Sequence, residues 1–278
     1  MPLPSMRVGD FTVRGVSDGA LAAPLDIILG MERPAAEQLI GATENGTFSI
    51  PVNNFLIRRG GKTILIDAGA SNTMQPMLGK LPGHLRAAGV DPAAVTTILM
   101  THLHPDHANG LVDDAGAPHY PNAEIAVNGI ELDFWTRPDD TSDRDPVKAN
   151  RARTRINLAT YRERIRSVRD GEDYLGFTAV LAPGHTPGHS CWLVAGSGGA
   201  GGGGFLAFGD TAHVAAIQFS HPDTVVVYDL DKRQAVASRK RILDMAASER
   251  LATAGADVSA PGLGHVVRKG AAFAFEPM

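Results

Sequence analysis

Three histidines and one aspartate lie within six positions of this sequence, directly after an apolar stretch that is typical of a buried strand. The apolar stretch covers residues 95–100, and the segment after it contains His102, His104, Asp106 and His107. Neutral imidazoles suit zinc or another borderline first-row metal, and a neighbouring carboxylate suits a second, harder ion. A lone histidine is more often a surface or core residue than a ligand, but this spacing indicates half of a two-metal site.

Two further apolar stretches end in residues that bind metals. Residues 177–181 precede Ala-Pro-Gly-His-Thr-Pro-Gly-His, which places His185 and His189 in a turn, and residues 205–208 precede Gly209 and Asp210. Glycine and proline fix the backbone around His185, and a glycine before Asp210 permits close approach of the chain. Asp210 alone could equally belong to a turn or a helix cap, but beside the other clusters we expect it to be a ligand.

Taken together, these motifs resemble the metal signature of the metallo-β-lactamase-fold hydrolase superfamily. Within it the chain is similar to the methyl parathion hydrolase branch, which is related to the acyl-homoserine lactone lactonases. The likeness runs through most of the chain and includes Val-Ser-Asp-Gly at 16–19, Leu-Ile-Asp-Ala-Gly at 65–69, Asp-Phe-Trp at 133–135, Val-Ala-Ala-Ile-Gln-Phe at 214–219 and Pro-Gly-Leu-Gly-His at 261–265. The metal motifs are specific for the superfamily, whereas the other segments are weak guides to the substrate.

The resemblance implies a fold and a set of metal ligands. The fold is α/β, a four-layer αββα sandwich, with residues 1–278 as a single domain. The implied ligands are His102, His104 and His185 for one metal, Asp106, His107 and Asp257 for the other, and Asp210 as the bridge. We expect two divalent ions, zinc first, with manganese or iron as alternatives. A metal-bridging hydroxide would then open lactones or cleave esters or phosphotriesters, with Asp106 accepting or relaying a proton.

The last metal ligand is where the chain departs from the family pattern. The relatives carry a histidine there, a few residues before the Pro-Gly-x-Gly-His stretch, whereas this chain has Asp257 after the strand expected at 251–256. A carboxylate is a harder donor, which favours manganese or iron and lowers the Lewis acidity of the metal. The alternatives are that His265 is the ligand, or that the second site is weak.

Other side chains are expected around the centre. His213 stands where related lactonases carry a tyrosine that contacts substrate, so it is either a substrate-polarising donor or acid, or a structural hydrogen-bonding partner. Phe134 and Trp135 match the aromatic pocket wall of the branch, although a lone tryptophan more often packs in a core. His189 is expected beside the ligands. A diiron redox protein of the same fold, and a degenerate metal-binding protein with an impaired second site, are the alternative functions.

Charge and cysteine content restrict the partners. The formal net charge is −4, and the basic residues cluster only at 151–169, which argues against nucleic acid or an anionic membrane as partner. No apolar stretch approaches the roughly 20 residues of a membrane span, and the first residues lack the pattern of a signal peptide. Cys191 is the single cysteine, so no intrachain disulfide can form. We expect a cytoplasmic enzyme with a small-molecule substrate, and a homodimer is left open.

Hydrophobic patterning predicts two similar halves. Apolar runs at 54–57 and 63–66, and again at 191–194 and 205–208, flank glycine-containing turns and predict hairpins. Each half is expected to continue into a helix and another strand, which favours two mixed sheets packed face to face.

Helical spacing predicts two long helices, at 147–169 and at 234–250. The arginines of the first are expected on its solvated face. The glycine-rich run at 196–204 lacks a Gly-Lys-Ser/Thr ending, so a flexible hairpin turn is predicted there and not a phosphate-binding loop.

Overall fold

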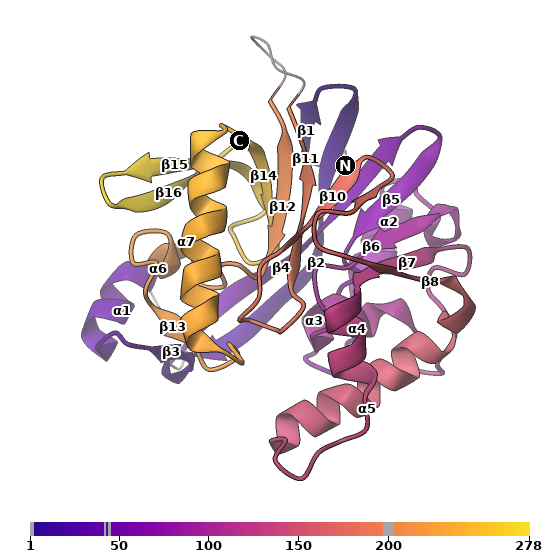
Figure 1. The fold of residues 1–278 in the computed structure, drawn as a ribbon, viewed down its shortest axis with the longest axis horizontal. Helices are drawn as coiled ribbons and strands as arrows, with labels where there is room; N and C mark the ends of the chain where they lie inside the picture. Colours follow the sequence, from indigo (N-terminus) through magenta and orange to yellow (C-terminus); the bar gives the residue numbers. More distant parts are fainter. Residues whose placement is uncertain (1–2, 42, 44–45, 197–202) are drawn as a thin grey trace.

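The structure, a computed structural model, describes residues 3–41, 43, 46–196 and 203–278. Two seven-stranded sheets pack face to face, and helices cover their outer faces (Figure 1). The four-layer α/β sandwich predicted from the sequence is therefore confirmed.

The first sheet comes from the first part of the chain. In spatial order its strands are β1 (Ser5–Val8), β2 (Phe11–Pro24), β4 (Thr47–Arg59), β5 (Lys62–Ile66), β6 (Thr97–Leu99), β7 (Glu124–Asn128) and β8 (Ile165–Val168). Neighbours from β1 to β5 are antiparallel, and neighbours from β5 to β8 are parallel. The helices that share a hydrophobic core with this sheet are α2 (Leu81–Ala87), α3 (Pro105–Ala108), α4 (Gly129–Thr136) and α5 (Asp145–Ala159).

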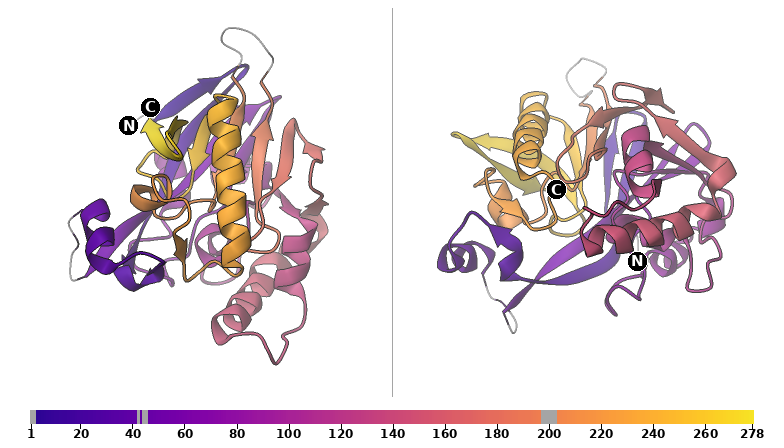
Figure 2. Two further views of the ribbon diagram at one scale, coloured as in Figure 1. Left: turned by 60° about the vertical axis from the view of Figure 1, so that its left-hand side comes forward. Right: turned by 60° about the horizontal axis from the view of Figure 1, so that its bottom comes forward.

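The second sheet comes from the remaining part. In spatial order its strands are β16 (Ala272–Pro277), β15 (Leu263–Lys269), β14 (Ala252–Gly255), β12 (Phe205–Gly209), β11 (Ser190–Val194), β10 (Phe177–Leu181) and β9 (Asp173–Tyr174). Only the β12–β14 pair is parallel among these described strands. Helix α7 (Lys232–Ser248) crosses the outer face of this sheet, as the views of Figures 1 and 2 show.

A smaller group of elements packs beside the sandwich. It consists of α1 (Arg33–Ile40), α6 (Ala215–Gln218), and the antiparallel pair of β3 (Ile28–Leu29) and β13 (Val225–Val226). Their apolar side chains share one cluster, which explains why they lie together on one side of Figure 2. Single turns of 3-10 helix occur at Leu25–Ile27, Pro92–Ala94, Asn109–Leu111 and Arg162–Arg164.

Alternation of side chains along the strands produces the layers. In β5, Leu65 packs with the helices of the first part, whereas Ile66 faces the opposite sheet. In β12, Phe205 belongs to that same central core, whereas Leu206 packs beneath α7. Because the central core draws side chains from both sheets, we propose that residues 1–278 form one domain.

Several predicted elements are confirmed. Strands β4 and β5 form a hairpin in which Arg59 pairs with Lys62, and β11 pairs antiparallel with β12. The helix predicted at 234–250 is α7, which begins at Lys232. Of the predicted glycine-rich turn, residues 197–202 lie outside the described residues. None of the described helices combines the length and apolarity that a membrane crossing requires.

The helix predicted at 147–169 is wrong in its second half. Helix α5 ends at Ala159, and residues 165–168 form β8, which pairs parallel with β7. The spacing of Leu158 and Tyr161 is helical, but pairing with a neighbouring strand overrides local spacing from Ile165 onwards. The expected solvated face is also wrong at Arg151, whose side chain is completely buried.

Candidate metal centre

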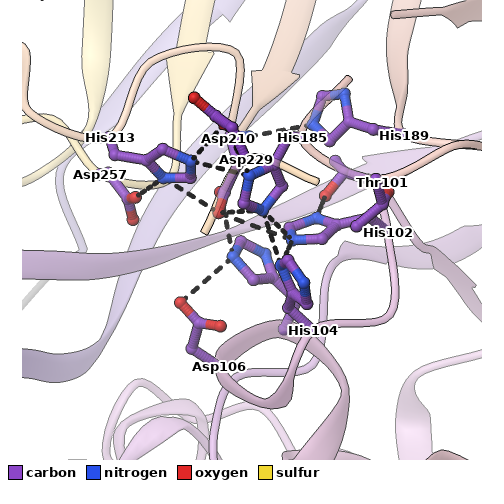
Figure 3. Close-up of polar contacts among 12 residues, drawn as sticks. Thr101, His102, His104, Asp106, His185, His189, Asp210, His213, Asp229 and Asp257 are labelled. Carbon is purple, nitrogen blue, oxygen red and sulfur yellow. Dashed lines mark hydrogen bonds and ion pairs between the residues drawn. The ribbon is translucent and has the colours of Figure 1, made fainter. Parts of the chain in front are cut away.

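The proposed ligands meet at one rim of the sandwich, where strands from both sheets end (Figure 3). His102 and His104 follow β6, His185 follows β10, and Asp210 and Asp257 follow β12 and β14. Strands β12 and β14 are parallel neighbours, so their carboxyl ends reach the same edge. Helix α3 begins at Pro105, a residue favoured at the first helical position, and carries Asp106 and His107 to this rim.

Three imidazoles form a first donor group. Nδ1 of His104 lies 3.2 Å from Nε2 of His102 and 2.6 Å from Nε2 of His185, and the two Nε2 atoms are 3.1 Å apart. Burial lowers the pKa of His102 and His104 well below the usual value, which keeps these rings neutral with their lone pairs available. Three converging neutral imidazole nitrogens are the arrangement that a zinc-type ion requires.

A second donor group consists of Asp106, His107 and Asp257, whose potential ligand atoms lie within 4.8 Å of one another. Nε2 of His107 and Oδ1 of Asp257 are buried without a hydrogen-bond partner among the described residues. Buried polar atoms without a partner cost about 1–3 kcal/mol each, so native sites rarely leave them unsatisfied. A bound cation would satisfy both atoms, and the residues present therefore fit the implied metal.

Asp210 lies between the two groups. Its Oδ2 lies 3.5 Å from Nε2 of His102 and 3.4 Å from Nε2 of His185. Its Oδ1 lies 3.0 Å from Nε2 of His107, and neither of these buried atoms has a described hydrogen-bond partner. Burial opposes ionisation of Asp210, but His107 and His213 outweigh it and hold the pKa well below its usual range. An ionised carboxylate facing both groups is suited to bridge two ions.

At the last ligand position, the structure brings Asp257 and not His265 to the rim. His265 is exposed on β15, and its Nδ1 lies 3.0 Å from the carbonyl oxygen of Leu251. Asp257 is buried, and its Oδ2 lies 2.8 Å from Nδ1 of His213. Burial, followed by the charge of Asp210, raises the pKa of Asp257 to about 7. The positive charge of a bound metal would favour its ionised form.

Both ring nitrogens of His213 contact other side chains of the rim. Nδ1 faces Asp257, and Nε2 lies 3.0 Å from Nδ1 of His185. His213 lines the cavity described below, as expected for a substrate contact, but in this arrangement its nitrogens also hold the rim together.

His189 lies behind the ligands. Its Nε2 accepts a hydrogen bond of 3.0 Å from the backbone N–H of Asp210, and its Nδ1 is 3.2 Å from the carbonyl oxygen of Ala182. Gly209 permits this contact, because a Cβ atom there would lie 2.8 Å from Nε2 of His189. The imidazole thus fixes the backbone that presents Asp210.

Further side chains orient the imidazoles of the two donor groups. Asp67 has a left-handed backbone (φ 58°), and its carboxylate accepts hydrogen bonds from the backbone and the hydroxyl of Thr101 and lies 2.9 Å from Nδ1 of His107. Asp229 lies 3.2 Å from Nδ1 of His185. Such contacts to the outer nitrogen select the tautomer that leaves the other nitrogen free for metal. Asp67 belongs to the Leu-Ile-Asp-Ala-Gly motif identified in the sequence at 65–69, whereas Asp229 was missed because no local motif marks it.

A cavity of about 480 Å³ opens onto the centre. Trp135 lies in its wall, and its ring centroid is 5.3 Å from that of His104. Much of the remaining wall is apolar and includes Leu21, Ile50, Met74, Val147, Val227 and Leu230. Phe134, in contrast, lines an adjoining cavity of about 400 Å³ and packs edge-on against Trp135. The structure therefore places only the tryptophan of the expected aromatic wall beside the first donor group.

Comparison with known proteins identifies similar sequences. Residues 49–253 match a family described as the metallo-beta-lactamase superfamily. An N-acyl homoserine lactonase of Azorhizobium caulinodans is 26% identical over 168 residues, which span 53% of this chain and 60% of that protein. An uncharacterized protein of Bacillus subtilis is 28% identical over 143 residues, which span 51% of this chain and 57% of that protein. The chain thus matches less than two thirds of the length of these curated relatives.

Two solved structures are similar over nearly their whole length. A hydrolase of the beta lactamase superfamily, AbOPH, has a TM-score of 0.92 and 27% identity, with 100% of this chain and 97% of that chain covered. AidC, a dizinc quorum-quenching lactonase solved with a bound product, has a TM-score of 0.88 and 25% identity, with the same coverage of 100% and 97%.

Proposed function

Because this chain belongs to the metallo-beta-lactamase superfamily, we propose that it is a hydrolase that requires two divalent metal ions and opens lactones or cleaves esters or phosphotriesters. The observation that supports this proposal most directly is the convergence of two donor groups on the shared carboxylate of Asp210. A complete set of donors favours a catalytic centre over a degenerate one.

The proposed assignment follows the two donor groups. One ion would be held by His102, His104 and His185, the other by Asp106, His107 and Asp257, and both by Asp210. When bound, such ions lower the pKa of water and polarise the carbonyl or phosphoryl oxygen of a substrate. Zinc is our first expectation, because imidazoles are the majority of the donors.

The protein's own residues prepare this chemistry. Three imidazoles have a second side chain at their outer nitrogen, which holds each ring in place. Thr101 contacts His102, Asp67 contacts His107, and Asp229 contacts His185. Asp106 has a partly exposed side chain in the cavity wall, where its carboxylate can accept a proton during hydrolysis. The largely buried rim excludes bulk water from the remaining donors.

The cavity limits the class of substrate. Its volume of about 480 Å³ suits a small molecule, and its wall offers apolar contacts opposite the polar rim. A substrate with an apolar group attached to a carbonyl or phosphoryl centre would place that centre at the ligands. The lactonase activity of AidC and of the Azorhizobium relative supports lactones as the first class to test.

Metal analysis combined with a hydrolysis panel tests the proposal. Protein expressed with zinc and manganese should contain close to two ions per chain and should hydrolyse at least one of a long-chain acyl lactone, an aryl ester and an aryl phosphotriester. Chelation should abolish that activity. His102→Ala should be inactive, whereas His265→Ala, which changes an exposed histidine outside the rim, should retain activity. A folded, metal-loaded protein that is inactive on all three substrates would reject the proposed hydrolase.

A further inference from the structure

Glu131, in the first turn of α4, is an acidic residue with a completely buried side chain, and it is not a member of either donor group. Burying a carboxylate is unfavourable unless its oxygens receive hydrogen bonds. Its partners therefore indicate why an acidic residue stands at this position.

Each carboxylate oxygen of Glu131 accepts two hydrogen bonds. Oε1 accepts from the backbone N–H of Leu103 at 2.9 Å and from Nε1 of Trp135 at 2.7 Å. Oε2 accepts from Oγ1 of Thr186 at 2.7 Å and from the backbone N–H of Gly188 at 3.0 Å. The four donors satisfy the carboxylate without any contribution from water.

Three of these four hydrogen bonds come from the loops that carry the first donor group, and the fourth comes from Trp135 on α4 itself. Leu103 lies between His102 and His104 in the loop after β6, and Thr186 follows His185 in the loop after β10. The two strands belong to different sheets. Contact with α4 is close, because a Cβ atom added to Gly188 would lie 2.1 Å from the backbone nitrogen of Glu131.

We propose that Glu131 is a positioning residue, whose carboxylate joins the His102–His104 loop to the His185 loop and sets the convergence of their three imidazoles. This role rests on the proposed metal centre. Glu131 acts through the backbone of both loops and does not itself contact the metal. It also holds Trp135, so the cavity wall and the first donor group are fixed by the same side chain.

Glu131→Gln keeps the shape of the side chain and should affect one of the two loops more than the other. The N–H groups of Leu103 and Trp135 can only donate, so the glutamine must turn its oxygen towards them. Its NH₂ group then faces Thr186, whose hydroxyl can accept, and the N–H of Gly188, which cannot. We therefore expect the His185 loop, and not the His102–His104 loop, to lose a hydrogen bond to this side chain and to shift. By analogy with other residues that orient ligands, we expect zinc affinity at the first donor group to fall about 10- to 100-fold.

Zinc affinity is measured by titrating the metal-free protein in competition with a chromophoric chelator. Glu124→Gln is the matched control, because Glu124 is a partly buried carboxylate on β7 that accepts a hydrogen bond from Tyr174 on β9 and likewise joins the two sheets. This control should bind both ions with wild-type affinity. Thr186→Val removes one hydrogen bond to Glu131 and keeps the side-chain shape. It should therefore lower zinc affinity at the first donor group by a smaller factor. This variant provides the test if Glu131→Gln does not fold.

Thermal unfolding separates positioning from a general structural role. If Glu131 only stabilises the fold, the substitution should lower the unfolding temperature by the same amount with and without zinc. The increase in unfolding temperature on adding zinc should then equal that of the wild type. If Glu131 positions the ligands, this increase should be smaller than in the wild type. Wild-type zinc affinity and an unchanged gain in both Glu131→Gln and Thr186→Val would overturn the role of Glu131. Absence of zinc binding by the wild type would instead overturn the metal centre itself, and this role with it.

Discussion

Asp257 shows how one residue can be adapted to its neighbours. Its Oδ2 faces Nδ1 of His213, while its Oδ1 is buried and has no described hydrogen-bond partner. A carboxylate held at one oxygen keeps the other available for a ligand. His213 therefore provides a reason why an aspartate can stand where the family pattern has a histidine.

Asp257→Ala should lower the metal content from two ions per chain towards one, because only the second donor group loses a ligand. His265→Ala should leave two ions bound, since this side chain lies outside the rim. Asp257→His would restore the imidazole of the family pattern and should bind zinc more tightly. Metal analysis after dialysis distinguishes these outcomes. Two ions in Asp257→Ala would show that Asp257 is not a ligand.

The donors of the rim could be predicted from the sequence because they occupy short motifs directly after apolar strands. His102, His104 and His107 illustrate this, since their spacing alone indicates a metal site. Asp229 and Glu131 could not be predicted in this way. Asp229 is 44 residues from His185, and Glu131 is 28 residues from Leu103. Their roles depend on how α4 and the segment after β13 pack, which no local pattern determines.

At the scale of elements, α5 fixes the segment that leads into it from α4. Nε of Arg151 donates to the carbonyl oxygen of Phe134 at 2.8 Å, and the guanidinium pairs with Asp143 and lies over the Phe134 ring. Arg144, next in the chain, lines both cavities. The buried arginine thus controls a segment of the cavity wall, although helical spacing placed it in solvent.

Arg151→Lys should loosen this segment while the metal content stays unchanged. Lysine keeps the charge but lacks the planar fork that contacts both Asp143 oxygens. We expect KM to rise about tenfold, equivalent to roughly 1.4 kcal/mol of binding free energy. Steady-state kinetics with metal analysis measures both quantities, and Arg162→Lys, at an exposed position of the same basic region, is the control. An unchanged KM would show that the segment does not contribute to substrate binding.

The same ion pair predicts a pH dependence. The hydrogen bond from Arg151 lowers the pKa of Asp143 from 3.8 to about 2. Because the folded-state pKa is depressed, the stabilisation is fully present above pH about 4, where unfolded aspartate is also ionised, and it is lost as the pH falls towards 2. The difference in unfolding temperature between wild type and Arg151→Lys should therefore be constant from pH 5 to 8. A difference that changes within this range would exclude Asp143 as its cause.

Elements that depend on local signals were predictable, and those that depend on distant pairing were not. The β4–β5 hairpin follows from Gly60 and Gly61 between apolar runs, and β10 matches its predicted bounds. Strand β8, in contrast, exists because Ile165–Val168 adds to the edge of β7. Its apolar residues continue the helical spacing of α5, so the sequence alone favoured a longer helix.

In the whole molecule, the centre lies where the two sheets meet. The loop that carries His102 and His104 follows β6 of the first sheet. The segments that carry the donors His185, Asp210 and Asp257 follow β10, β12 and β14 of the second sheet. Opening of the sandwich would therefore separate the donors, and metal binding should be coupled to global stability.

Cys191 should report that global opening. Its thiol is completely buried in the cluster beneath α7, and burial raises its pKa to about 12. Native protein at pH 8 should therefore resist a thiol reagent, because neither access nor thiolate is available. Denatured protein should react with one equivalent per chain, since Cys191 is the single cysteine. Rapid labelling of native protein would show that this layer opens without unfolding.

Removal of the metals should lower the unfolding temperature of the whole molecule. Each ion that binds only the folded state adds about 2.7 kcal/mol when its free concentration is 100 times its dissociation constant. For a domain of this size, that corresponds to roughly 5 to 10 °C per ion. Calorimetry with and without a chelator measures the difference, and zinc should restore it. His102→Ala, which lacks a ligand of the first donor group, should show a smaller shift. Identical unfolding of chelated and zinc-loaded wild type would show that the two sheets are not joined through bound metal.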